Sequence, residues 1–278
     1  MAQLSISTAW NETTAFLSRE ARLVFPVAFL LVALPGLALQ LAGPASAPGE
    51  MPQIGVLWLV LLPVTIAAGI IGSIAIAFLA LRPGTSVGEA LQRGLRRFIP
   101  LFLASLLIGV AAMIVIIPLV MLVVGGSALS GGDLSEGDLA ALAGPLVLLA
   151  LILLVLGVAL WVKLMLMTPV AASEDDAGPI RIIARSWTLT AGHFWKLLGF
   201  VLLLFIAIIV TTIVISMIAG ILIALFAGPP EPNSLSFVLL GIVSAVVQAI
   251  ISAVVVTLTA RVYVQLSGRS DQVGDVFT

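Results

Sequence analysis

The stretch LLGFVLLLFIAIIVTTIVISMIAGILIALF, residues 197–226, contains no Asp, Glu, Lys or Arg. About 20 consecutive apolar residues are enough to cross the hydrocarbon core of a bilayer as a helix, so this stretch predicts a transmembrane helix. Five similar stretches lie at 23–41, 54–81, 101–124, 145–167 and 236–264. Of the 278 residues, 62% are hydrophobic and 9% are charged, whereas a soluble domain has about 25% charged residues. The sequence therefore predicts an all-α, polytopic membrane protein with six transmembrane helices.

The charged residues separate into two groups along the chain. The connections 42–53, 125–144 and 228–235 hold five acidic residues and no Lys or Arg, and all 12 basic residues lie elsewhere. Basic residues concentrate on the cytoplasmic side of membrane proteins. We therefore expect the basic segments, and with them the N and C termini, to be cytosolic.

Amphipathic segments precede three of the stretches. In SVGEALQRGLRRF, residues 86–98, apolar side chains recur at helical spacing opposite the charged ones, and GPIRIIARSWTLTAGHFW, residues 178–195, follows the same rule. The N-terminal segment shows the pattern more weakly. Each amphipathic segment is followed by a predicted transmembrane stretch, an acidic connection, a second transmembrane stretch and a basic residue. This order predicts one membrane domain, 1–278, with three elbow-helix-plus-hairpin repeats at about 1–82, 83–167 and 168–266 and a short polar tail at 267–278.

The segments TSVGEALQRGLRRFIPLFLASLL and VAASEDDAGPIRIIARSWTLTAGHFWKLLGFVLL resemble the membrane domain fused to some bacterial glycerophosphodiester phosphodiesterases, and related stand-alone membrane proteins. The distinctive residues lie in the second segment, at Glu174, Gly178, Arg185, Ser186, Trp187, Leu189, Gly192 and Phe194. The resemblance implies a multi-pass protein of the bacterial inner (cytoplasmic) membrane. It does not imply phosphodiesterase activity, because catalysis in the fused enzymes belongs to a soluble barrel with His and acidic metal ligands, which nothing in this sequence encodes.

Residues suited to catalysis are few. The chain has no Cys and a single histidine, His193, which supports neither thiol chemistry nor a zinc site. Three adjacent acids, Glu174, Asp175 and Asp176, lack the alternating ligands of a calcium loop, although Mg²⁺ or Ca²⁺ remains an alternative. They precede a helix expected to begin near Pro179, whose positive end favours acids. We expect no enzyme activity and no catalytic, cofactor or metal site.

Basic side chains beside the membrane carry the strongest functional signal. Anionic lipids attract such side chains by roughly 1 kcal/mol each. The residues predicted to contact an anionic phospholipid or a cytosolic protein partner are Arg82, Arg93, Arg96, Arg97, Arg181 and Arg185. The simpler alternative is that they only set topology and solvate a face. Nucleic acid is not an expected partner, because the patch is small and lies at the membrane.

Two further side chains have predicted local roles. Glu174 is expected to pin the loop under the bundle by a salt link to an arginine such as Arg185. Lys163 lies near the inner end of its stretch, where a long side chain reaches the headgroups.

Small residues at helical spacing predict close helix packing. They are Gly69 and Ser73 in the second stretch, and Gly241, Ala245, Gln248 and Ala249 in the sixth. For Gln248, lining of a substrate path is the lesser alternative.

These observations favour a non-enzymatic integral membrane protein, a scaffold or modulator linked to envelope or lipid processes. The alternative is a permease-like transporter subunit for a lipidic or small apolar substrate. It is opposed by the absence of ionisable residues at mid-membrane.

Overall fold

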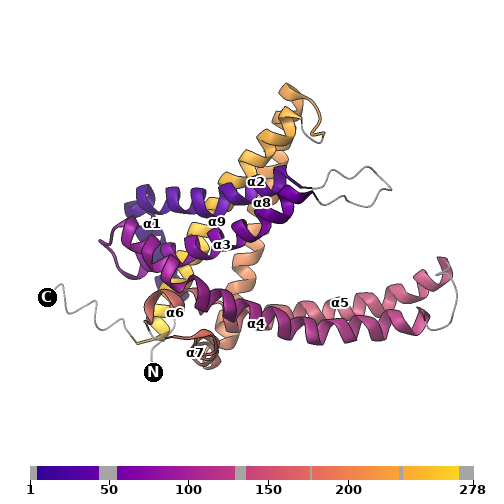
Figure 1. Cartoon of the computed structure of the whole chain (residues 1–278), viewed down its shortest axis with the longest axis horizontal. Coiled ribbons are helices and arrows are strands. Elements are labelled where there is room, and N and C mark those ends of the chain that lie inside the picture. The colour runs from indigo at the N-terminus through magenta and orange to yellow at the C-terminus, as the bar shows by residue number, and fades with distance from the viewer. Residues whose placement is uncertain (1–4, 44–54, 129–135, 176, 232–233, 269–278) are drawn as a thin grey trace.

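The computed structural model describes residues 5–43, 55–128, 136–175, 177–231 and 234–268. Within these ranges every regular element is a helix, as Figure 1 shows. The elements are α1 (Ile6–Ala28), a π-helical turn η1 (Phe29–Ala33), α2 (Leu34–Leu41), α3 (Val56–Leu81), α4 (Val87–Ala128), α5 (Glu136–Leu164), α6 (Met167–Ser173), α7 (Pro179–Ala191), α8 (Phe194–Ala227) and α9 (Leu235–Leu266). Six helices are long and apolar enough to cross a membrane, which confirms the predicted number of spans.

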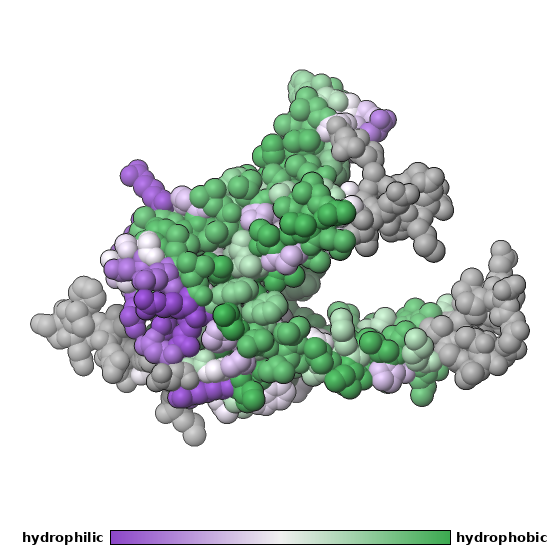
Figure 2. All heavy atoms as spheres, viewed as in Figure 1, coloured by the Kyte–Doolittle hydropathy of each residue, from purple (hydrophilic) through white to green (hydrophobic). Residues whose placement is uncertain are grey.

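The helices form two arms (Figure 1). The α4–α5 hairpin makes one arm, and α2, α8 and α9 extend along the other. Helix α3 packs against α4 and α9, and α6 packs against α3, so the arms meet beside α6. Figure 2 shows apolar side chains over both arms, a hollow between them, and hydrophilic side chains gathered near α6. This distribution suits helices whose sides face lipid and whose joined end faces water.

The three amphipathic segments differ in how they join their spans. Residues 86–98 form the beginning of α4, which continues without a break into the third span. The N-terminal segment likewise runs through α1, η1 and α2 as one helical rod. Helix α7 is separate, because the chain leaves helical geometry at His193 (φ −127°, ψ 18°) before α8 begins. The helical path is therefore interrupted just before the fifth span, whereas the first and third spans continue from the segments that precede them.

Small residues create the close helix contacts, although not at every predicted position. Gly241, Ala245 and Ala249 are buried along α9, and an added Cβ at Gly241 would lie 2.7 Å from Leu37 Cδ1 of α2. In α3 the close approach is made by Gly72, where an added Cβ would lie 2.8 Å from Leu31 Cβ. At Gly69 an added Cβ would meet nothing within 4 Å.

Ser73 and Gln248, the other two residues expected at helix contacts, do not lie buried between helices. Ser73 is half-buried, and its hydroxyl donates to Ile70 O within the same helix (2.9 Å) rather than across an interface. Gln248 is exposed on α9. A stripe of small residues identifies a helix that packs closely, but the neighbouring helix decides which turn makes the contact.

Candidate functional site

The site begins with the first turns of α4. Ser86 and Glu89 form a reciprocal cap, because Ser86 Oγ accepts from Glu89 N (3.2 Å) and Glu89 Oε2 accepts from Ser86 N (3.3 Å). One turn further, Gly94 lies against α3. A Cβ at Gly94 would be 2.7 Å from Ile71 O, so only glycine permits this approach. The contact fixes the rotation of α4 and thus the direction of its arginines.

Arg93 and Arg97 point from α4 to the loop that joins α6 to α7. Arg93 Nε donates to Ala172 O (2.9 Å), and its Nη1 pairs with the Asp175 carboxylate. Arg97 is buried and donates to the carbonyls of Glu174 and Ala177. The last carbonyls of a helix lack intrahelical partners, and cations are stabilising there. These two arginines therefore hold the end of α6 and the following loop.

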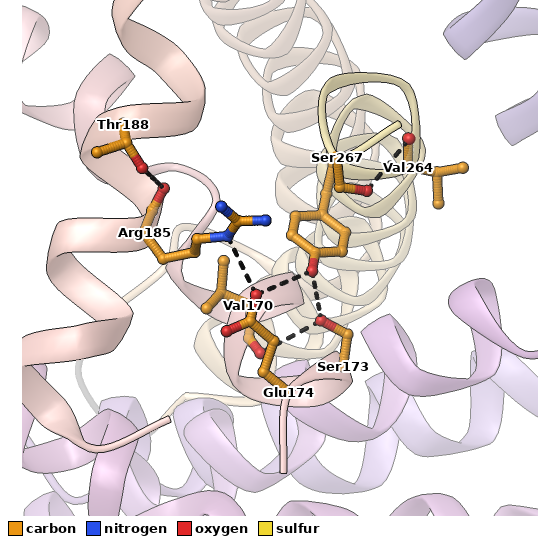
Figure 3. Close-up of polar contacts among 8 residues, drawn as sticks. Val170, Ser173, Glu174, Arg185, Thr188, Val264 and Ser267 are labelled. Carbon is orange, nitrogen blue, oxygen red and sulfur yellow. Dashed lines mark hydrogen bonds and ion pairs between the residues drawn. The ribbon is translucent and has the colours of Figure 1, made fainter. Parts of the chain in front are cut away.

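The side chain of Glu174 is held from the opposite direction. Arg185 Nε on α7 lies 3.2 Å from Glu174 Oε1, the pairing suggested by the sequence (Figure 3). The hydroxyl of Tyr263, a fully buried residue of α9, donates to the same oxygen (3.4 Å). That hydroxyl accepts from Ser173 Oγ at 2.8 Å. Glu174 thus joins α6, α7 and α9 at one point.

Two of the three adjacent acids, Glu174 and Asp175, take part in these contacts. The Arg93 guanidinium, by hydrogen bonding and by charge, lowers the pKa of Asp175 below its ordinary value of 3.8, so this carboxylate stays ionised at a lower pH than an unpaired one. Asp176 lies outside the described residues. Among the described residues no three His, Cys, Asp or Glu side chains converge as a metal site.

An arginine pocket lies on the other side of Arg93. It has a volume of about 260 Å³, and its lining includes Phe78, Arg82, Glu89, Arg93 and Arg96. The guanidinium carbons of Arg82 and Arg93 lie 5.2 Å and 5.9 Å from the centre of the Phe78 ring. Cations above an aromatic face are held in position without being neutralised. Arg93 is already paired with Asp175, so the excess positive charge comes from Arg82 and Arg96 against Glu89, and this excess makes the pocket suitable for an anion.

The six arginines predicted to contact an anionic lipid or a protein partner thus lie in different surroundings. Arg93, Arg97 and Arg185 contact the α6–α7 loop, and Arg93 alone of these also lines the pocket. Arg82 and Arg96 are exposed at the pocket, and Arg181 is exposed on α7. Phe78 was not predicted, although its position four residues before Arg82 places both side chains on one face of the helix.

Six helices long and apolar enough to cross a membrane, with hydrophilic side chains gathered where the two arms meet, define a multi-pass membrane protein. The sequence matches the family described as Domain of unknown function (DUF7847) over residues 4–266, so the chain belongs to this family. No curated protein and no solved structure matches the chain at a significant level.

Proposed function

We propose that this protein binds the headgroup of an anionic phospholipid in the arginine pocket and acts, without catalysis, as a scaffold or modulator in envelope or lipid processes. The observation that carries the proposal is the pocket lining, with three arginines and one carboxylate. Arginine forms two parallel hydrogen bonds to phosphate, which makes it the side chain of choice for phosphate recognition.

The local contacts favour a preformed site. Arg93 is fixed by Ala172 O and Asp175, so the wall of the pocket that it forms is held in place. Arg82 is positioned over Phe78 at the end of α3. Side chains that are already held in position lose less conformational entropy when a ligand binds to them. Arg82 and Arg96 then supply the exposed guanidinium groups for the phosphate.

The location of the protein is part of the same proposal. The charge distribution favours a cytosolic position for the arginine pocket and for both termini. The resemblance to the membrane domain of glycerophosphodiester phosphodiesterases supports the bacterial inner membrane and a link to lipid processes. The threefold repeat is also proposed, from the order of amphipathic segments and hairpins in the sequence. In this arrangement the pocket opens at the level of the headgroups of the cytosolic leaflet.

Native mass spectrometry of detergent-purified protein, loaded with equal amounts of phosphatidylglycerol and phosphatidylcholine, tests the proposal. Wild type is expected to retain one phosphatidylglycerol selectively. The double variant Arg82→Gln/Arg96→Gln loses two basic groups worth about 1 kcal/mol each, so its affinity is expected to fall roughly 30-fold. Arg22→Gln removes an exposed arginine of α1 outside the pocket and is the matched control. Equal, unselective binding by all three proteins contradicts the proposal.

A further inference from the structure

A second cavity, separate from the arginine pocket, lies between α5 and the junction of α7 with α8. It has a volume of about 590 Å³ and is lined by Leu156, Ala159, Leu160, Lys163, Trp187 and Phe194. Ligand pockets of roughly 300–1,000 Å³ are typical for small molecules. Lys163 is the charged residue of this lining.

The four lining residues of α5 form one stripe. Leu156, Ala159, Leu160 and Lys163 follow helical spacing, so the apolar part extends about 10 Å from the lysine toward the middle of the span. The cavity is therefore polar at one end and apolar along its length. This polarity matches a ligand with a charged head and a hydrocarbon chain.

The ammonium group of Lys163 is positioned for an anion. Its Nζ lies 5.3 Å from the ring centres of both Trp187 and Phe194. Neither of the two ion pairs found among the described residues involves Lys163. The hydroxyl of the buried Ser186 donates to the Lys163 carbonyl (2.8 Å), which anchors this turn of α5 to α7. A half-buried cation among apolar groups gains most from a charged hydrogen-bond acceptor.

We infer that this cavity binds a long-chain carboxylate, with the carboxylate on Lys163 Nζ and the acyl chain along the stripe Leu160–Leu156. A carboxylate needs only one cation, whereas a phospholipid headgroup offers phosphate and ester oxygens that call for several donors. The lining supplies, besides Lys163, only the indole N–H of Trp187 as a side-chain donor. The single positive charge and the small number of hydrogen-bond donors in the lining therefore favour a fatty acid over a diacyl phospholipid.

The test uses a diazirine-bearing fatty acid that crosslinks to the purified protein in phosphatidylcholine nanodiscs. Crosslinks are expected on the peptide containing 156–163, displaced by oleate and not by methyl oleate, which has the same chain without the charge. Lys163→Gln is expected to weaken binding about tenfold or more, because a charged hydrogen bond is lost. Lys163→Arg is expected to retain most of it. Lys196→Gln, which removes an exposed lysine of α8, is the matched control and is expected to bind as wild type.

Three results overturn the inference: unchanged binding by Lys163→Gln, equal competition by methyl oleate and oleate, or displacement by dioleoylphosphatidylglycerol as effective as by oleate. The comparison of oleate with its methyl ester uses wild type, so it remains decisive if Lys163→Gln folds poorly. Ala159→Phe supplies a further check, because it fills the cavity while leaving the charge in place. It is expected to reduce crosslinking at least tenfold, and crosslinking at the wild-type level contradicts the inference.

Discussion

Replacing Gly94 by alanine tests how α4 is positioned against α3. The added Cβ would lie 2.7 Å from Ile71 O and 2.9 Å from Ile71 Cγ2, well inside the ordinary contact range that begins near 3.4 Å. The nearest atom belongs to the backbone, so rotation of a side chain cannot relieve the contact and the helices must separate. Overpacking of this kind costs about 1–3 kcal/mol.

Gly109 provides a control in the same helix. An added Cβ there meets nothing within 4 Å, and alanine is the better helix former by up to about 1 kcal/mol. Gly94→Ala should therefore lower the free energy of unfolding while Gly109→Ala leaves it unchanged or raises it, a difference of about 1–4 kcal/mol.

The assay is SDS titration of the protein in mixed micelles, followed by tryptophan fluorescence and circular dichroism. Equal stability of the two variants would refute the reasoning, because it would mean that α4 does not lie against Ile71 as described. A shift of α4 should also move Arg93 and Arg97 from the α6–α7 loop. Gly94→Ala is therefore expected to make this loop more sensitive to limited proteolysis, and Gly109→Ala is not.

Three further predictions concern the loop. Arg97→Met leaves two loop carbonyls without their charged donor and should cost about 3 kcal/mol in SDS unfolding, whereas a cost below 1 kcal/mol contradicts the assigned contacts. Because Arg93 lowers the pKa of Asp175, their ion pair stabilises the fold above pH 4, and this stabilisation is lost as the pH falls through the lowered pKa. Asp175→Asn should therefore make the thermal unfolding temperature depend less on pH in the acidic range, by a small amount seen only at low salt, because Asp175 is exposed. An unchanged pH dependence in this variant contradicts the pairing. Tyr263→Phe removes a buried donor to Glu174 and should cost about 1 kcal/mol, measured by the same SDS titration, with no change expected if the hydroxyl is satisfied elsewhere.

The sequence predicted the parts of the fold that depend on the bilayer alone. Crossing a membrane requires about 20 apolar residues with internally bonded backbone, and six such helices are present. The pairing of Glu174 with Arg185 was also accessible, because opposite charges lay near one another in a short cytosolic segment.

The inward direction of Arg93 and Arg97 was not accessible from the sequence. The sequence pattern of an amphipathic helix is the same whether its polar face contacts water, lipid headgroups or another loop of the protein. Their partners lie about 80 residues further along the chain, and most are backbone carbonyls, which leave no mark in the sequence. The surroundings of Lys163 could not be predicted either. The sequence suggested that its side chain reaches the headgroups, but it did not indicate that the rings of Trp187 and Phe194 lie beside its ammonium group.

The central claim is that the arginine pocket holds an anionic headgroup. Its most direct test is a peptide map of crosslinks from phosphatidylglycerol that carries a photoreactive group on the headgroup, in bilayers of mixed composition. We expect the crosslinks to concentrate on residues 78–96 in wild type, to disappear from that segment in Arg82→Gln/Arg96→Gln, and to persist in Arg22→Gln. Crosslinks spread evenly over all the basic segments, or unchanged in the double variant, would contradict the claim.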